Sequence, residues 1–199
     1  MNWDERYATD DYRFGTDPNA FLVAEVHRIP KGARVLAVAD GEGRNGVYLA
    51  GRGAHVHSVD GSAVAIEKAR RLATTRDVTL ELEHADLFHW RWPVASYDAV
   101  VAIFVQFVTA EDRPAFFARL KDALKPGGVL LLEGYRIEQI GYGTGGPRDA
   151  SHLYTEEMLE TAFADMQIES LHAYDAVIKE GTGHSGLSAL IDLVAIKRG

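Results

Sequence analysis

The residues best suited to chemistry begin with a turn that contains two glycines. An apolar run over residues 35–39 leads through Asp40, Gly41, Glu42 and Gly43 into a segment with a helical pattern. Glycine allows a ligand to approach the backbone closely, and the first turn of a helix offers unpaired N–H groups to the ligand's polar end. The turn alone is weak evidence, because many turns contain two glycines.

Two aspartates strengthen this interpretation. Asp60 ends the second apolar run, 17 residues beyond Gly43, where a carboxylate can accept both hydroxyl hydrogens of a ribose. Asp86 follows the third run, where it can accept a hydrogen bond from an adenine amino group. Each has a plainer interpretation, since Asp60 can cap the helix after Ser62 and Asp86 can be a solvated loop carboxylate. Together they predict a nucleoside site.

A parallel sheet would bring these residues to one edge, and the alternation of apolar runs with amphipathic segments predicts such a sheet. We expect strands over 34–39, 55–59, 78–84, 97–105 and 128–133, with helices over 45–52, 62–73 and 113–124. A helix over 155–164 and a strand hairpin over 168–179 and 187–197 follow. The predicted fold is α/β and Rossmann-like: a seven-stranded mixed sheet, mostly parallel with one antiparallel strand, and helices on both faces.

Length and composition predict one domain. The chain has 199 residues, and its 47% hydrophobic content is enough for a substantial core. We divide it into an N-terminal lid (1–20), a core that binds the cofactor (34–133), and an insert, helix and hairpin on the acceptor side (134–199). The longest apolar run, 99–105, is too short to cross a membrane, and no signal pattern is visible at the N-terminus. We therefore expect no membrane partner and a cytoplasmic location.

Charge and residue types exclude several classes of function. The formal net charge of −8 repels phosphate backbones, so nucleic acid is not an expected partner. The chain has no cysteine, hence no thiolate nucleophile. Its histidines lack a metal-ligand spacing, and no metal is expected. The oligomeric state is not predicted.

The set of motifs resembles the class I S-adenosylmethionine-dependent methyltransferases over roughly residues 34–133. The resemblance is carried by the glycine turn, Asp60, Asp86, the strand 97–105 and the Lys-Pro-Gly-Gly turn at 125–128. The chain departs from the family at Ala37, where an acid is common, and at Ala39, where the first glycine is common. These changes bear on the backbone path of the turn.

A finer resemblance involves the string 39–45 together with Trp3, Tyr7 and residues 14–19. It is similar to the tellurite-resistance and thiopurine methyltransferase subgroup, whose members methylate small, soft, polarisable acceptors. The resemblance implies S-adenosylmethionine as cofactor and a small-molecule acceptor, with sulfur or another chalcogen as nucleophile. The cofactor-binding residues we predict are Trp3, Tyr12, Ala39, Asp40, Gly41, Gly43, Asn45, Asp60, Gly61, Ser62, Asp86, Leu87 and Ile103.

The N-terminal segment packs several aromatic residues among charges, Trp3, Tyr7, Tyr12 and Phe14. Aromatic faces attract a positively charged sulfur, and a cover that excludes water favours methyl transfer. The segment is therefore a candidate lid over the cofactor. These aromatics can equally be anchors that hold a terminal segment on the core.

No catalytic residue is fixed by the sequence. A nucleophile with a low pKa needs only alignment with the methyl carbon and sulfur, whereas an alcohol needs a base. The candidates on the acceptor side are Arg136, Tyr142 and His184, of which His184 is more simply a solvent-facing residue of the last turn. Segments 105–107, 133–136 and 141–147 are expected to build the acceptor pocket.

Two other classes of function remain open. The glycines at 41, 43 and 46 formally spell the dinucleotide motif G-x-G-x-x-G, so an NAD-dependent oxidoreductase is one alternative. The position of Asp86 and the turn at 125–128 argue against it. The other alternative is a sensor that binds S-adenosylmethionine without turnover, which the changes at Ala37 and Ala39 would permit.

Overall fold

The computed structural model describes residues 2–199. The strands are β1 (Arg34–Val38), β2 (His55–Asp60), β3 (Glu81–His84), β4 (Tyr97–Ile103), β5 (Leu124–Tyr135), β6 (Gln167–Glu180) and β7 (His184–Ile196). The α-helices are α1 (Trp3–Tyr7), α2 (Ala20–Glu25), α3 (Arg44–Gly51), α4 (Ala63–Thr75), α5 (Arg113–Ala123), α6 (Gln139–Tyr142) and α7 (Glu156–Ala162). Two 3₁₀ turns, Val26–Arg28 and Ala150–His152, complete the elements.

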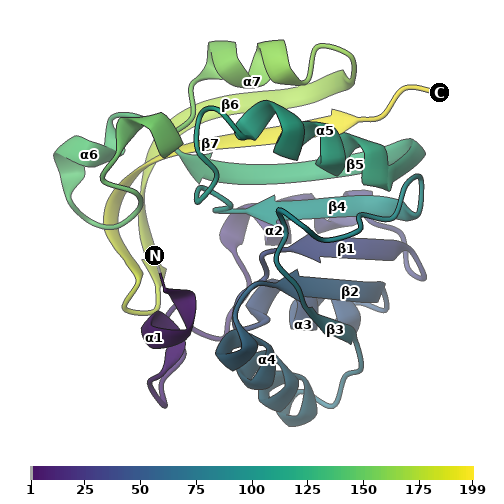
Figure 1. The fold of residues 1–199 in the computed structure, drawn as a ribbon, viewed down its shortest axis with the longest axis vertical. Coiled ribbons are helices and arrows are strands. Elements are labelled where there is room, and N and C mark those ends of the chain that lie inside the picture. Colours follow the sequence, from purple (N-terminus) through teal and green to yellow (C-terminus); the bar gives the residue numbers. More distant parts are fainter. Residues whose placement is uncertain (1) are drawn as a thin grey trace.

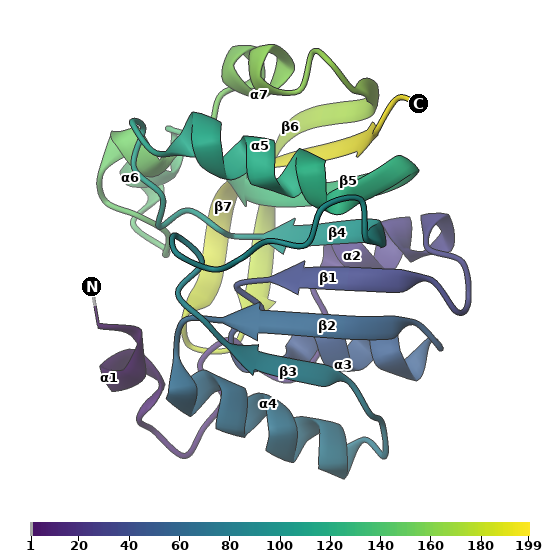
Figure 2. The ribbon, with the colours of Figure 1, turned by 45° about the vertical axis from the view of Figure 1, so that its right-hand side comes forward.

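The predicted fold is confirmed. The seven strands form one sheet in the order β3-β2-β1-β4-β5-β7-β6. β1 to β5 pair in parallel, and β7 is antiparallel to both of its neighbours. Figure 1 and Figure 2 show helices on both faces of this sheet, with α5 and α7 on one side and α2 and α3 on the other.

Alternation along the strands builds the core on both faces, because successive side chains of a strand point to opposite sides. Leu36 of β1 joins an apolar cluster with Phe116 of α5, whereas its neighbour Val35 joins a second cluster with Leu49 of α3. All four side chains are buried. The central strands β1 and β4 therefore have nearly continuous apolar sequences, whereas the edge strand β3 is polar and no residue of it is buried.

Several boundaries differ from the prediction. β3 begins at Glu81 rather than at residue 78, and β7 begins at His184, so His184 is a strand residue and not part of the turn. The predicted lid contains the short helix α1, and a second helix that the sequence did not predict, α2, begins at the last residue of the lid, Ala20. None of the helices within residues 2–199 is long and apolar enough to cross a membrane.

The carboxyl ends of the parallel strands meet at one edge of the sheet, which faces α1 and the turn between β6 and β7 (Figure 1). The N-terminal segment touches that turn directly, since the Gly183 N–H donates to the Arg13 carbonyl over 2.9 Å. A side chain at Gly181 would collide with the same carbonyl, at 2.3 Å from its Cβ. The first and last parts of the chain thus close over the strand ends together.

Candidate cofactor and acceptor site

A cavity of about 370 Å³ lies at this edge, within the range of sites for small molecules and cofactors. Eleven of the predicted residues line it: Trp3, Ala39, Asp40, Gly41, Asn45, Asp60, Gly61, Asp86, Leu87, Ile103 and His184. They come from α1, from α3, from the ends of β1, β2 and β4, from the loop after β3, and from the start of β7. The fold therefore gathers residues that are far apart in the sequence.

Asp60 is held by two backbone donors. Its carboxylate accepts hydrogen bonds from the N–H of Gly41 and of Ser62, each over 2.8 Å. The side chain is buried, and this burial raises the pKa of Asp60 against the opposing effect of the two N–H donors. A carboxylate has more lone pairs than these donors use, so it can still accept from a ligand's hydroxyl groups.

Asp40 stabilises the turn from within. Its carboxylate accepts from the hydroxyl of Ser58 over 2.9 Å and from the N–H of Gly46 over 3.2 Å. Burial raises the pKa of Asp40 to about 7 against these hydrogen bonds. A Cβ at Gly46 would lie 2.4 Å from this carboxylate, so packing against Asp40 accounts for the third glycine of the dinucleotide-like string.

Ala39, which stands where glycine is common in the family, adopts a backbone conformation typical of glycine. Its φ of 49° lies in the left-handed region, which favours glycine. Gly41 is left-handed too, at 58°, and a Cβ there would come within 2.9 Å of the Tyr7 hydroxyl. The turn follows the path that glycines at both positions would allow, and Ala39 adopts it with a side chain.

Three predicted cofactor residues lie outside the cavity lining. Tyr12 donates its hydroxyl to the Lys68 carbonyl over 3.0 Å and so belongs to the packing of α4. Gly43 is the N-cap of α3 with φ of 87°, and a Cβ there would meet Ala69 at 2.6 Å. Ser62 caps α4 and donates to the Asp4 carboxylate. All three shape the surrounding elements.

Arg136 and Tyr142 are not brought into the cavity either. Both bond the carboxylate of Asp175 on β6, and the Arg136 guanidinium also donates to the carbonyls of Leu190 and Tyr174. The reason lies in the pairing of β5, β7 and β6, which places Asp175 beside these two residues. The expectation that they hold or wall the acceptor is therefore not met by their positions.

The aromatic residues of the N-terminal segment form a cover over the cavity. Tyr7 stacks on Trp3 with ring centroids 5.6 Å apart and meets Phe14 edge-on at 6.2 Å. All three line the cavity, and Tyr7 is buried. A ligand below them is shielded from water and faces aromatic rings.

A buried ion pair fixes this cover to the core. Lys68 of α4 contacts Glu42 of the turn over 2.6 Å, and both side chains are almost fully buried. The Lys68 ammonium also donates to the Asp11 carbonyl, while Glu42 accepts from the N–H of Phe14. The N-terminal segment is thus bonded to the two elements that frame the predicted cofactor site.

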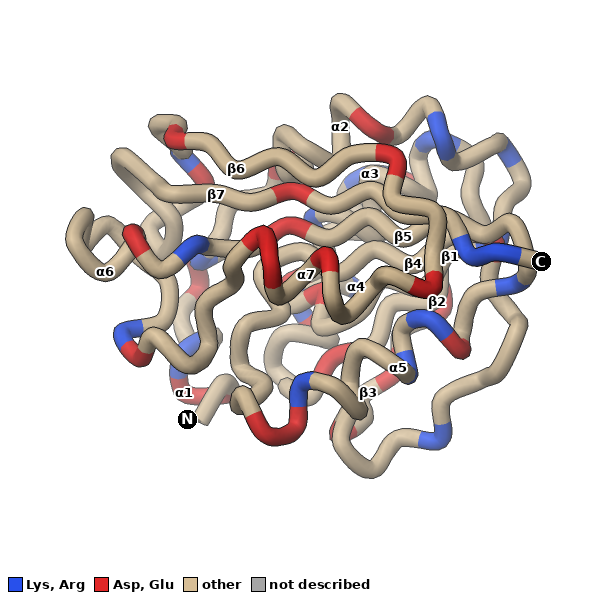
Figure 3. The backbone as a smooth tube through the Cα atoms, turned by 90° about the horizontal axis from the view of Figure 1, so that it is seen from above, with Lys and Arg blue, Asp and Glu red and all other residues tan. Residues whose placement is uncertain are grey.

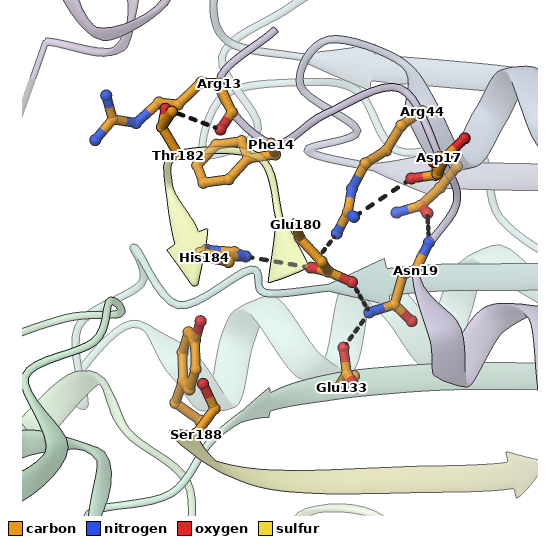
Figure 4. A network of polar contacts seen from close by, with 12 residues as sticks. Arg13, Phe14, Asp17, Asn19, Arg44, Glu133, Glu180, Thr182, His184 and Ser188 are labelled. Atoms are coloured by element: carbon orange, nitrogen blue, oxygen red, sulfur yellow. Dashed lines mark hydrogen bonds and ion pairs between the residues drawn. The ribbon is translucent and has the colours of Figure 1, made fainter. Parts of the chain in front are cut away.

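A second polar network closes the other end of the cavity (Figure 4). Arg44 of α3 pairs with Glu180 of β6 over 2.6 Å, and the Asn19 amide bridges Glu180 and Glu133. Burial favours the neutral form of Glu180, but the hydrogen bond from His184 and the charge of Arg44 outweigh it and lower the pKa of Glu180 to about 2. Within residues 2–199 no cation lies at hydrogen-bond distance from Glu133, and burial raises the pKa of Glu133 well above the ordinary value.

Sequence reasoning missed several lining residues. They are Asn2, Asp4, Gly15, Glu42, Arg44, Phe88 and Phe104, whereas Tyr7 and Phe14 of the predicted lid and Phe107 of the predicted acceptor pocket do line the cavity. Phe104 follows β4 and is left-handed, with φ of 55°. Gln106, two residues further on, exchanges hydrogen bonds with the backbone of Tyr135. Their positions depend on long-range packing, for which the sequence carries no local signal.

Comparisons with known proteins agree with the fold. Residues 35–128 match the family model described as a methyltransferase domain. The glycine/sarcosine N-methyltransferase of Aphanothece halophytica is 29% identical over 161 residues, which are 71% of this chain and 60% of that protein. The chain spans 26–60% of the length of the first curated relatives that it matches.

Two solved structures share the architecture over nearly the whole chain. One, described as "Conversion of a Disulfide Bond into a Thioacetal Group during Echinomycin Biosynthesis", has a TM-score of 0.76 at 21% identity and covers 98% of this chain and 90% of that one. TehB from Haemophilus influenzae has a TM-score of 0.74 at 18% identity, with 98% and 66% covered.

The fold and the comparisons together support the assignment of this chain to the class I S-adenosylmethionine-dependent methyltransferases. The narrower assignment to the tellurite-resistance and thiopurine subgroup stays a prediction.

Proposed function

We propose that this protein transfers the methyl group of S-adenosylmethionine to a small acceptor with a soft sulfur or chalcogen nucleophile. The observation that carries the proposal is the cavity at the carboxyl ends of the parallel strands. It combines an oriented buried carboxylate, Asp60, with a cover of aromatic rings.

The residues present fit this cofactor. Asp60 and Asp86 offer acceptors for a nucleoside, and the turn at Gly41 leaves no Cβ between ligand and backbone. Trp3, Tyr7 and the nonpolar Ile103 suit a sulfonium that must be kept from water. When bound, S-adenosylmethionine supplies an electrophilic methyl group, and the chain's part is to bind, orient and dehydrate the reacting pair.

A small acceptor is favoured over nucleic acid by charge. The chain carries a net charge of −8, and Figure 3 shows its Lys and Arg residues interspersed with Asp and Glu. Duplex and single-stranded nucleic acids need a basic groove or stripe. The cavity itself is of modest size and lies under the N-terminal cover.

Calorimetric titration with S-adenosylhomocysteine tests the cofactor, with NAD as a parallel ligand. We expect saturable binding of the first alone. Asp60→Asn should weaken it about tenfold or more, because the substitution removes a charged acceptor, whereas Asp122→Asn on the exposed side of α5 should not. Binding of NAD, or of neither ligand, would contradict the proposal.

Turnover separates an enzyme from a sensor. Formation of S-adenosylhomocysteine should be measured with a panel of small thiols and chalcogen oxyanions. Turnover with at least one acceptor is expected, and tight cofactor binding without turnover by any of them would favour the sensor.

A further inference from the structure

The strand order sets a direction along the cavity. Asp86 follows β3 and Asp60 ends β2, so the acids suited to a nucleoside lie toward one edge of the sheet. His184 lies beyond β1 in the opposite direction, because its ring contacts Phe104 after β4 at 4.4 Å and Tyr135 at the end of β5 at 5.5 Å. It therefore stands at the end of the cavity away from the nucleoside side, where an acceptor would enter.

Glu180 orients this histidine. The Nδ1 atom of His184 lies 3.4 Å from a carboxylate oxygen of Glu180, which Arg44 holds from the other side (Figure 4). An ionised carboxylate can only accept hydrogen bonds, so Nδ1 carries the hydrogen when the imidazole is neutral. The lone pair of the neutral ring is then on Nε2.

Nε2 is the ring nitrogen that is available to accept a proton. It makes no hydrogen bond to any residue between 2 and 199, although the residue is only 9% exposed and lines the cavity. Burial lowers the pKa of His184, opposed by Glu180 and aided by the charges of Arg44 and Arg13. The rings of Phe14 and Tyr135 also contact the imidazole, at centroid distances of 4.4 and 5.5 Å, and this burial favours its neutral form.

The charged residues that line the cavity limit which acceptors can bind beside Nε2 of His184. Five acidic residues line it: Asp4, Asp40, Glu42, Asp60 and Asp86. Arg44 is the one arginine or lysine among the lining residues between 2 and 199, and Glu180 already occupies it. An oxyanion acceptor would therefore find no unpaired cation among these lining residues, whereas an uncharged acceptor needs none.

We propose that Glu180 and His184 form a base at the acceptor end of the cavity, and that the acceptor is an uncharged molecule whose reacting atom carries a hydrogen, a thiol above all. This inference rests on the proposed methyl transfer and names the chemical class of its acceptor. His184 is the catalytic residue, and Glu180 is the positioning residue that fixes its tautomer.

The step balances as follows for an acceptor X–H. The Nε2 lone pair of His184 takes the proton, and the electron pair left on X forms the bond to the methyl carbon. The pair of the broken carbon–sulfur bond stays on sulfur, which changes from a sulfonium to a neutral thioether. The positive charge moves to the imidazolium, next to Glu180, and the proton then leaves to solvent.

Histidine titration by NMR tests the pair without any cofactor. Nitrogen shifts should show the neutral His184 ring protonated at Nδ1. Glu180→Gln should lower the pKa of His184, because it removes the carboxylate that stabilises the imidazolium. Glu83→Gln, next to the distant His57, is the matched control and should leave His184 unchanged. A neutral ring protonated at Nε2, or an unchanged pKa in Glu180→Gln, would overturn the proposal.

Kinetics with aryl thiols of graded acidity test the acceptor class. His184→Asn should slow transfer to thiols that are protonated at the assay pH by about 10²–10⁴-fold, but should change little for thiols already ionised. Binding of S-adenosylhomocysteine should persist in this variant. Equal loss for both groups of thiols, or faster turnover of selenite or tellurite than of thiols, would refute the inference, whereas absent cofactor binding in the parent protein would refute the proposed function itself.

Discussion

Two histidine–glutamate pairs, His57–Glu83 and His184–Glu180, lie toward opposite edges of the sheet. They differ in whether the second ring nitrogen of the histidine has a hydrogen-bond partner. Both nitrogens of His57 in β2 are satisfied, Nε2 by Glu83 over 2.9 Å and Nδ1 by the Tyr97 hydroxyl over 2.7 Å. His184 uses one nitrogen toward Glu180 and keeps the other. The same residue types thus stabilise the fold where every polar atom is paired, and can act on a ligand where one atom is left unpaired.

The largest expected effect on stability comes from Glu180→Gln. The change breaks a buried ion pair and leaves the Arg44 charge without its carboxylate, so we expect the free energy of unfolding to fall by about 3 kcal/mol. Urea denaturation at pH 7 measures it. Glu83→Gln, whose carboxylate is more exposed, should cost about 1 kcal/mol. Equal losses in the two variants would erase the difference between the pairs.

Acid titration sharpens this prediction. The pKa of Glu180 is about 2 in the folded protein and 4.5 in its ordinary range, so its charge contributes stability above pH 4.5. That contribution is lost as the pH falls from about 4.5 toward 2. The difference in unfolding free energy between the parent protein and Glu180→Gln should therefore stay constant from pH 6 to 8 and shrink below pH 4.5.

Tyr97→Phe should have a smaller effect, confined to the other pair. It removes the hydroxyl that satisfies Nδ1 of His57 inside the sheet, and an unpaired buried nitrogen costs about 1–2 kcal/mol of unfolding free energy. Binding of S-adenosylhomocysteine and the titration of His184 should not change. A loss of cofactor affinity in this variant would show that the two ends of the sheet are coupled.

The sequence predicts the surroundings of the His57–Glu83 pair better than those of the His184–Glu180 pair. The strands that carry His57 and Asp60 follow from local apolar runs, and the aspartates follow from their places at strand ends. Local sequence contains this information because β2 is buried on both faces over residues 56–60.

The pair at the acceptor end depends on contacts that the sequence does not signal. Arg44 and Glu180 are 136 positions apart and meet only because the end of β6 comes close to the start of α3. Conversely, Arg136 has the right residue type and the right strand end for the acceptor pocket. The pairing of β6 with β7 instead places Asp175 beside Arg136, and the two side chains form an ion pair. No local sequence pattern reveals this contact.

The smallest expected effect concerns the backbone at the cavity end of the sheet. Ala39 and Phe104 both line the cavity with left-handed φ angles, and such a conformation costs a residue with a Cβ about 1 kcal/mol. Ala39→Gly should therefore raise the unfolding free energy by about 0.5 kcal/mol, after allowing for the greater freedom of glycine in the unfolded chain. Ala37→Gly, within β1, is the matched control and should lower it by about 1 kcal/mol. If Ala39→Gly raises stability and leaves S-adenosylhomocysteine binding intact, the strain at Ala39 destabilises the fold without contributing to ligand binding. If affinity falls instead, the rigid alanine helps to hold the turn in the conformation that binds the ligand.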